Sequence, residues 1–326
     1  MSVESNVKET LSAQKGFRPT SDFFRCLALV GAIVIILILQ AVLVPGSVTL
    51  RQVMNIARQA SGLGIVAIGQ ALVILSGGID LSVGSVITLA NVLCTTIMVG
   101  RNENTFLGVT ITLLVCAFIG FINGMGVVKL RIAPFIMTLC MMSVAQGAFL
   151  VYTGGSPGGM ASPALRAVST TFFFNKIPCA ALVWLFSALI IWAILKFTTF
   201  GRSIYATGAN ATAARLSGIP TQAVTISVFV ICSTLVGLAG LLMSGFIGTS
   251  SLSLGADYIN NSLAAVLVGG NAISGGKGGI LGVVLATYLI FLLFALLTML
   301  ALGQVGKLIA QGLIIFAVVA VQKKFN

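Results

Sequence analysis

Long apolar runs, separated by short polar or glycine-rich stretches, follow one another along almost the whole chain. About 20 predominantly apolar residues are enough for a helix to cross the hydrocarbon core of a bilayer. The repeating pattern therefore predicts an all-α integral membrane protein, a bundle of about 8–10 transmembrane helices with ten favoured. The ten runs lie at about residues 27–44, 53–75, 83–99, 106–128, 134–152, 179–197, 223–247, 259–270, 279–301 and 304–321.

Three of these runs are weaker than the others, so eight or nine crossings also fit the pattern. The run at 83–99 is short, and only a short turn separates it from the run that begins at Phe106. The run at 259–270 is too short to cross a bilayer unless it begins earlier, which predicts a broken or half-spanning helix.

The polar segment at residues 1–26 precedes the first apolar run. It is too long for the charged region of a signal peptide, and no small-residue cleavage motif follows the run. We therefore expect a retained first helix and a cytoplasmic N-terminal tail at 1–26. The transmembrane domain is expected at 27–321 and a short cytoplasmic end at 322–326.

The basic residues favour one orientation, because Lys and Arg are enriched in cytoplasmic loops. With ten spans and the N-terminus inside, the inner side holds 12 of the 18 basic residues and the outer side holds 6. The outer six are Arg51, Arg58, Arg101, Arg166, Lys176 and Lys307. Both termini are therefore predicted to be cytoplasmic. The Gly-, Pro- and Ser-rich stretch 153–178 is then extracytoplasmic, and the stretch 198–222 is cytoplasmic.

Composition supports the membrane class and argues against several others. Hydrophobic residues make up 58% of the chain and charged residues 7%, whereas a soluble domain usually carries about 25% charged residues. The basic residues are scattered over loops and helix ends, which argues against nucleic-acid binding despite a net charge of +12. The chain has no His, and its 6 Cys share no metal-ligand or disulfide-like spacing. We therefore expect no metal site and no His-based catalysis.

A glycine-rich turn interrupts the apolar pattern at residues 76–82. Gly77 and Gly78 permit a sharp reversal of the chain, and Asp80 or Ser82 could cap the helix that follows. An acidic residue close to a membrane helix is also a candidate for contact with a substrate or ion. Both interpretations stay open at this point.

A second glycine-rich turn, at residues 269–279, resembles a phosphate-binding loop without completing its pattern. The pattern needs a Gly where the chain has Asn271, and a Ser or Thr where the chain has Gly278. We therefore expect no nucleotide or other cofactor bound by this chain. We also expect no enzymatic activity of its own.

Uncharged amide side chains inside the runs are candidates for a solute pathway. Such amides suit neutral, hydroxyl-rich solutes, and they are equally common as hydrogen-bonding contacts between membrane helices. The residues are Asn55, Gln59, Gln70, Asn91, Asn123, Gln146, Asn260 and Asn261. Only Asp80, Glu103 and Asp257 are acidic after residue 22. This scarcity disfavours an ion-driven carrier and favours an external energy source.

The stretch 198–222 contains one short segment with helical character. Ala211–Leu216 is a run of good helix formers, bounded by Asn210 before it and by Gly218 and Pro220 after it. A short helix on the cytoplasmic face could dock a soluble motor subunit. An ordinary connecting loop fits the same residues.

Three ordered motifs resemble the permease subunits of bacterial ABC importers of the ribose/arabinose/xylose type. They are Ile74–Ser85, Gly201–Gly218 and Ala264–Gly279, and Tyr152–Pro157 is similar to a further family stretch. The resemblance implies a permease in the bacterial inner (plasma) membrane that imports a pentose or hexose such as ribose, allose, xylose or arabinose. It also implies partners: an ABC ATPase subunit that binds the ATP, a periplasmic sugar-binding protein, and a second permease copy in a homodimer surrounded by lipid.

In that family the cytoplasmic loop supplies the helix that docks on the ATPase, so the resemblance gives this role to the matching residues here. They are Gly201, Gly208, Asn210, Ala213, Ala214, Arg215, Leu216, Ser217 and Gly218. The chain departs from the family pattern at Ala211, where an acid is common, and at Tyr258–Asn260, where Tyr-Glu-Leu is common. The alternatives are a permease of the same type for a signalling furanose or an amino acid, and a secondary carrier.

Overall fold

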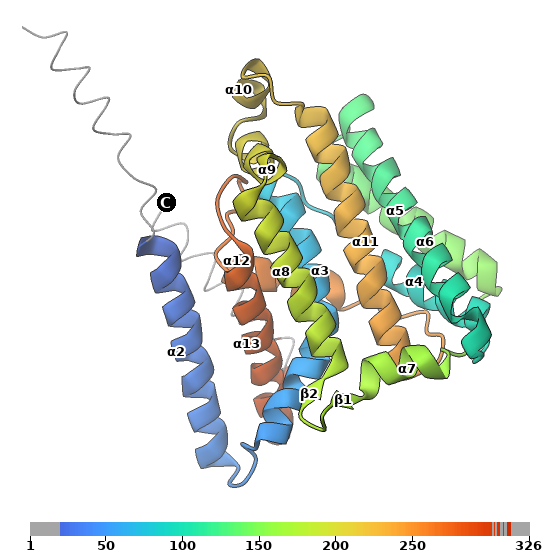
Figure 1. The fold of residues 1–326 in the computed structure, drawn as a ribbon, viewed down its shortest axis with the longest axis vertical. Coiled ribbons are helices and arrows are strands. Elements are labelled where there is room, and N and C mark those ends of the chain that lie inside the picture. The colour runs from blue at the N-terminus through green and yellow to red at the C-terminus, as the bar shows by residue number, and fades with distance from the viewer. Residues whose placement is uncertain (1–19, 302, 304, 307–308, 310–311, 314–326) are drawn as a thin grey trace, which may run out of the picture.

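A computed structural model describes residues 20–301, 303, 305–306, 309 and 312–313. The described chain is a bundle of helices with one small antiparallel hairpin (Figure 1). In chain order the elements are α2 (Thr20–Leu43), α3 (Leu50–Leu75), α4 (Val83–Met98), the 3-10 helix η1 (Asn102–Asn104), α5 (Thr105–Lys129), α6 (Pro134–Thr153), α7 (Pro163–Thr170), β1 (Phe172–Phe173), β2 (Ile177–Pro178), α8 (Cys179–Phe197), α9 (Thr199–Ala209), α10 (Ala211–Leu216), α11 (Thr221–Ile247), α12 (Tyr258–Val268) and α13 (Ile280–Met299).

Seven of the described helices are long and apolar enough to cross a membrane, namely α2, α3, α5 with the preceding η1, α6, α8, α11 and α13. Helices α4 and α12 are apolar but shorter. The 11 residues of α12, at about 1.5 Å per residue, span roughly half of the hydrocarbon core. The predicted all-α class and the predicted short helix are confirmed. The count of ten crossings stays a prediction, because most of the run 304–321 lies outside the described residues.

The two ends of the bundle differ in structure (Figure 1). Helix α7 and the β1–β2 hairpin lie at one end, which we call the hairpin end. Helices α9 and α10 lie at the opposite end, which we call the α10 end. The stretches 153–178 and 198–222, predicted to lie on opposite sides of a membrane, are therefore at opposite ends of the bundle. Which end is cytoplasmic stays a prediction.

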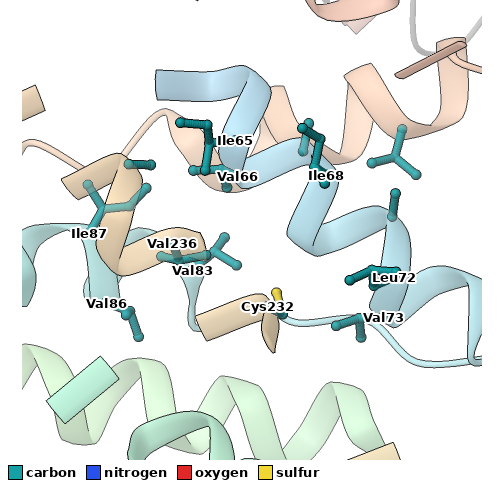
Figure 2. Packing of buried hydrophobic residues seen from close by; sticks show 14 of the residues in the cluster. Ile65, Val66, Ile68, Leu72, Val73, Val83, Val86, Ile87, Cys232 and Val236 are labelled. Carbon is teal, nitrogen blue, oxygen red and sulfur yellow. The ribbon is translucent and has the colours of Figure 1, made fainter. Parts of the chain in front are cut away.

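Helix α3 forms the centre of the core. Every residue from Ala60 to Leu75 is buried, so this part of the helix is covered on all sides, as in the interior of a large protein. Figure 2 shows Ile65 of α3, Ile87 of α4 and Val236 of α11 in this core. Close van der Waals packing of this kind is a main source of helix association in a bilayer.

Helices α5 and α11 approach each other through glycines. A Cβ added to Gly124 would lie 2.7 Å from the Cα of Ile226, and one added to Gly120 would lie 2.8 Å from the Cα of Val230. Such distances are too short for real side chains. The two glycines therefore allow a helix contact that any larger residue would push apart.

The sequence patterns did not predict two short helices, α7 and α9. The Oγ atom of Ser162 accepts a hydrogen bond from the N–H of Leu165 (3.3 Å), and Pro163 occupies the first turn of α7. The Oγ atom of Thr198 accepts a hydrogen bond from the N–H of Gly201 (3.1 Å) at the start of α9. Both helices therefore begin with a recognisable cap, but they are too short for a clear hydrophobic period.

Candidate functional site

At the α10 end the chain forms the short helix that the sequence predicts. Helix α10 covers Ala211–Leu216, which confirms both predicted bounds. The Oδ1 atom of Asn210 accepts a hydrogen bond from the N–H of Ala213 (2.9 Å), which satisfies one of the free amides at the helix start. Gly218 follows with a φ of +83°, a conformation that glycine adopts without strain.

Helix α10 directs large side chains away from the bundle. Leu216 is 81% exposed, whereas Ala214 is 5% exposed and faces inward. Arg215, beside Leu216, is also exposed. An exposed apolar side chain next to a basic one on a capped helix is suited to anchoring a protein partner.

The nine residues to which the resemblance gives a docking role fall into two groups. One group is exposed and can touch a partner, and the other is buried or half-buried against the bundle. The exposed residues are Asn210, Ala213, Arg215, Leu216, Ser217 and Gly218, and the inward residues are Gly201, Gly208 and Ala214. Gly201, for example, lies against the backbone of Leu195 near the end of α8. The second group is therefore suited to fixing the loop in place.

Gly208 belongs to a contact between backbones that we call the glycine junction, formed by Gly77, Gly208, Gly275 and Gly276. Gly208 of α9 lies directly against the carbonyl oxygen of Leu75, the last residue of α3. The N–H of Gly276 donates a hydrogen bond to the same oxygen (3.0 Å). A Cβ on Gly208 would also lie 2.8 Å from the nitrogen of Gly276. A larger residue at 208 therefore requires one of the three backbones to move.

The junction joins the two glycine-rich turns that the sequence singled out separately. Gly77 and Gly275 have φ angles of +89° and +83°, and a Cβ on Gly275 would lie 3.0 Å from the Cα of Gly77. Tyr205 of α9 donates its hydroxyl hydrogen to the carbonyl oxygen of Gly278 (3.0 Å). Helix α9 is thus fixed both to the turn after α3 and to the turn between α12 and α13.

Asp80 lies in a buried hydrogen-bonded cluster. Its Oδ1 atom accepts hydrogen bonds from the N–H of Ser82 (2.8 Å) and from the hydroxyl of Ser82 (2.6 Å). Of the two residues expected to cap α4, Ser82 makes no side-chain cap hydrogen bond, and its backbone is helical (φ −73°, ψ −12°) rather than extended as at a usual N-cap. Asp80 does accept one backbone amide at the helix start, that of Ser82 itself.

Two predicted pathway residues join the cluster around Asp80. The Nδ2 atom of Asn123 donates to the hydroxyl of Ser82 (3.1 Å). With its side-chain amide turned so that the nitrogen faces the carbonyl, Gln70 donates to the carbonyl oxygen of Asp80 (3.1 Å) and accepts from the N–H of Asp80 (3.3 Å). Gln70 and Asn123 are fully buried. Their contacts hold α3, α4 and α5 together, which favours a structural role over contact with a solute.

The other predicted pathway amides lie outside this cluster. Gln59 is exposed and lines a cavity at the hairpin end. Asn55 and Asn261 are half-buried, and Asn260 is exposed. The structure therefore separates the buried amides of Gln70 and Asn123, which join helices, from the exposed amides of Gln59 and Asn260, a division that the sequence does not give.

Asn91 is a further structural amide. Its Nδ2 atom donates to the hydroxyl of Ser244 (2.8 Å) and to the carbonyl oxygen of Thr249 (3.2 Å), and its Oδ1 atom accepts from the N–H of Ser251 (2.7 Å). These bonds join α4 to the end of α11 and the loop that follows. Among the described residues, no group of three or more Cys, Asp or Glu could hold a metal ion.

Comparisons with known proteins place the chain beside transport permeases. Residues 52–319 match the family described as "Branched-chain amino acid transport system / permease component". The chain is 34% identical over 293 residues to the ribose import permease protein RbsC of Haemophilus influenzae, covering 88% of this chain and 90% of that protein. It is 30% identical over 242 residues to the fructose import permease protein FrcC of Rhizobium meliloti, covering 72% of this chain and 67% of that protein. It is 34% identical over 248 residues to the inner membrane ABC transporter permease protein YjfF of Escherichia coli, covering 74% of this chain and 73% of that protein. No solved structure matches the chain.

Proposed function

The chain belongs to this permease family, within its group of sugar ABC importers, and we propose that it is the transmembrane permease subunit of a binding-protein-dependent ABC importer for a monosaccharide. The seven span-length helices supply the membrane domain. The names of the relatives, which include ribose and fructose import permeases and an inner-membrane permease, support a pentose or hexose as cargo. They also support the bacterial inner membrane as the location.

The observation that carries the proposal is the connection between α10 and the membrane helices. Helix α10 directs Arg215 and Leu216 outward. Behind it, Gly208 packs on the carbonyl oxygen of Leu75 with no side chain between the backbones. An ATPase subunit that displaces α10 would therefore also displace the end of α3 and the α12–α13 turn. Nucleotide-driven switching requires a physical connection between the helix that the ATPase moves and the membrane helices that change position.

This arrangement assigns each partner of the importer to one part of the permease. A separate ATPase subunit binds the ATP at the α10 end, which faces the cytoplasm, and this chain carries no catalytic site. A periplasmic sugar-binding protein delivers the solute at the hairpin end. A second copy of the permease completes the pathway in the lipid bilayer.

An amino-acid permease of the same type is the second candidate, because the description of the matching family names branched-chain amino acids. Transport by the reconstituted importer separates the two. The chain is purified with its ATPase and binding protein, placed in proteoliposomes, and offered D-ribose, D-fructose or L-leucine. We expect uptake of a monosaccharide that requires both ATP and the binding protein. Uptake of leucine alone would favour the second candidate, and uptake driven by a proton gradient without ATP would contradict both.

The variant Arg215→Glu tests the docking role of α10. Reversing an exposed charge at a protein interface is expected to lower ATP-driven uptake by about tenfold, while membrane insertion is unchanged. Arg202→Glu is the matched control, since Arg202 is exposed on α9 outside the docking helix. Normal ATPase association of the Arg215→Glu variant, or an equal loss in both variants, would argue against the assignment.

A further inference from the structure

A cavity at the hairpin end has the lining of a binding site, and we infer that it holds one small, neutral, polyhydroxylated solute, namely a single monosaccharide ring. The inference rests on the proposed function, since it places the cargo of that importer. The cavity has a volume of about 130 Å³ and lies between α3, α7, α8, α11, α12 and α13. At roughly 30 Å³ per water molecule it has room for several waters or one small solute. Its polar lining residues are Arg58, Gln59, Ser61, Ser169 and Tyr258.

Arg58 supplies a positive group that is held in place. Its guanidinium carbon lies 5.4 Å from the ring centroid of Phe172 and 5.2 Å from that of Phe246. Its Nη1 atom donates to the carbonyl oxygen of Thr170 (3.3 Å), the last residue of α7. Aromatic rings and a helix C-terminus both stabilise a cation. The Nε atom is buried and has no hydrogen-bond partner among the described residues, so its N–H, one of the five N–H donors of an arginine, is not used within the described protein.

Two buried hydroxyls supply acceptors. Ser61 and Ser169 are each 1% exposed. The hydroxyl of Ser61 donates to the carbonyl oxygen of Ala57 (2.8 Å), and that of Ser169 donates to the carbonyl oxygen of Leu165 (3.1 Å). Each hydroxyl has one hydrogen and two lone pairs, so the hydrogen is used while the lone pairs stay available. Both side chains can therefore accept from a hydroxylated ligand.

The mixture of donors and acceptors favours a neutral polyol over an ion. No Asp or Glu is among the described residues that line the cavity, so nothing there compensates a cation. A fully ionised anion carries only acceptors, which would suit Arg58 but leave the lone pairs of Ser61 and Ser169 unmatched. A sugar hydroxyl donates and accepts, so it matches both kinds of group. The rings of Tyr258 and Phe291, which also line the cavity, add the apolar surface typical of small-molecule sites.

Gln59 marks the place where the cavity meets the outside of the bundle. It is exposed, whereas every residue of α3 from Ala60 to Leu75 is buried. An amide that faces lipid without a hydrogen-bond partner is unfavourable, so Gln59 needs water, a solute or another polar surface beside it. The cavity is therefore entered beside Gln59 and ends against the buried part of α3. A solute can reach it from the hairpin end and is separated from the α10 end.

Sugar binding to the intact permease–ATPase complex in lipid nanodiscs, without the binding protein, tests the inference. Saturation-transfer NMR with D-ribose and with D-fructose at millimolar concentration detects such weak contacts. We expect a signal from at least one sugar, and a fall of about three- to tenfold in affinity in Gln59→Leu and in Tyr258→Phe, because each variant removes hydrogen-bonding groups. Gln222→Leu and Tyr152→Phe make the same exchanges at positions outside the cavity. They are expected to bind as the wild type does.

Three outcomes would overturn the inference: no signal from either sugar in the wild type, wild-type affinity in both cavity variants, or displacement of the sugar by inorganic phosphate, which would indicate an anion site at Arg58. ATPase association of each variant is measured beside binding, so that a folding defect is recognised. The uptake assay keeps the two proposals apart. An importer that takes up no monosaccharide contradicts the proposed function, whereas normal uptake with binding independent of Gln59 and Tyr258 contradicts only the cavity assignment.

Discussion

The two ends of the bundle are built in opposite ways. At the α10 end, the backbones at Leu75, Gly208 and Gly276 meet with no side chain between them. At the hairpin end, Arg58 and several large side chains surround a cavity of about 130 Å³. A backbone contact has no rotamers that could absorb a displacement, whereas a cavity lined by side chains can adjust to what it holds. The comparison indicates that one end is suited to transmitting movement and the other to receiving a solute.

The largest effect is expected from filling the glycine junction with Gly208→Val. The added side chain would overlap the carbonyl oxygen of Leu75 and approach the nitrogen of Gly276, and such overpacking costs about 3 kcal/mol. We expect ATP-driven uptake in proteoliposomes to fall about 100-fold. The exposed face of α10 is unaltered, so the ATPase subunit should still bind.

The matched control for this variant is Gly147→Val. Gly147 lies in the middle of α6, and an added Cβ there meets nothing within 4 Å. Uptake by this control is expected to stay close to that of the wild type. Normal uptake by Gly208→Val would show that the junction can open without consequence, and the contrast between the two ends would fail.

A smaller effect is expected at the exposed tip of the same end, in Leu216→Asp. Leu216 is 81% exposed, so the chain should fold normally, but loss of an apolar interface anchor costs about 1.4 kcal/mol or more. The affinity for the ATPase subunit, measured by titration in detergent or nanodiscs, should fall about tenfold. Leu130→Asp changes a leucine that is 70% exposed outside α10 and should leave that affinity within about twofold. Equal losses in the two variants would contradict docking at α10.

At the hairpin end, Arg58→Gln is expected to lower stability without affecting ATPase binding. The variant removes two cation–π contacts and the hydrogen bond to Thr170, together worth about 1–2 kcal/mol. Thermal denaturation of the purified complex should begin a few degrees lower, and Arg58→Lys, which keeps the charge, should lie between the variant and the wild type. A change in ATPase affinity without a change in stability would contradict the separation of the two ends.

The smallest effect is expected from Tyr205→Phe. It removes the hydrogen bond to the carbonyl oxygen of Gly278 (3.0 Å) and leaves the glycine contacts intact. At about 0.5–1 kcal/mol for one hydrogen bond, uptake per ATP hydrolysed should fall about two- to fourfold. A loss as large as that of Gly208→Val would assign the connection to the tyrosine rather than to the backbone contact.

The helices were predictable because the bilayer fixes their length and polarity. The run at 179–197 coincides with α8, and the short run at 259–270 lies within two residues of α12 at each end. The bounds of α10 were also predictable, because Asn210 and Gly218 are local capping signals that act on their immediate neighbours. Each of these features depends on residues close together in the chain.

The two sites were not predictable in the same way, because each joins distant segments. Gly208 and Gly276 belong to motifs that the sequence identifies separately, and no feature of the residues around either glycine predicts that the two are in contact. Arg58 was predicted only as a basic residue on the outer side, whereas its position depends on the rings of Phe172 and Phe246. The amides of Gln59 and Gln70 look alike in the sequence, yet only one reaches open space. Tertiary packing decides such cases.

Two distances between spin labels in the assembled importer test most directly whether the glycine junction moves with α10. The first pair joins Thr212 on α10 to Lys277 in the α12–α13 turn, and the second joins Thr212 to Leu130 after α5; all three positions are exposed. If the glycine junction moves with α10, a non-hydrolysable ATP analogue should leave the first distance unchanged and shift the second. A shift in both distances would show that α10 moves independently of the turn that joins it to the glycine junction, and would contradict the coupling of the two.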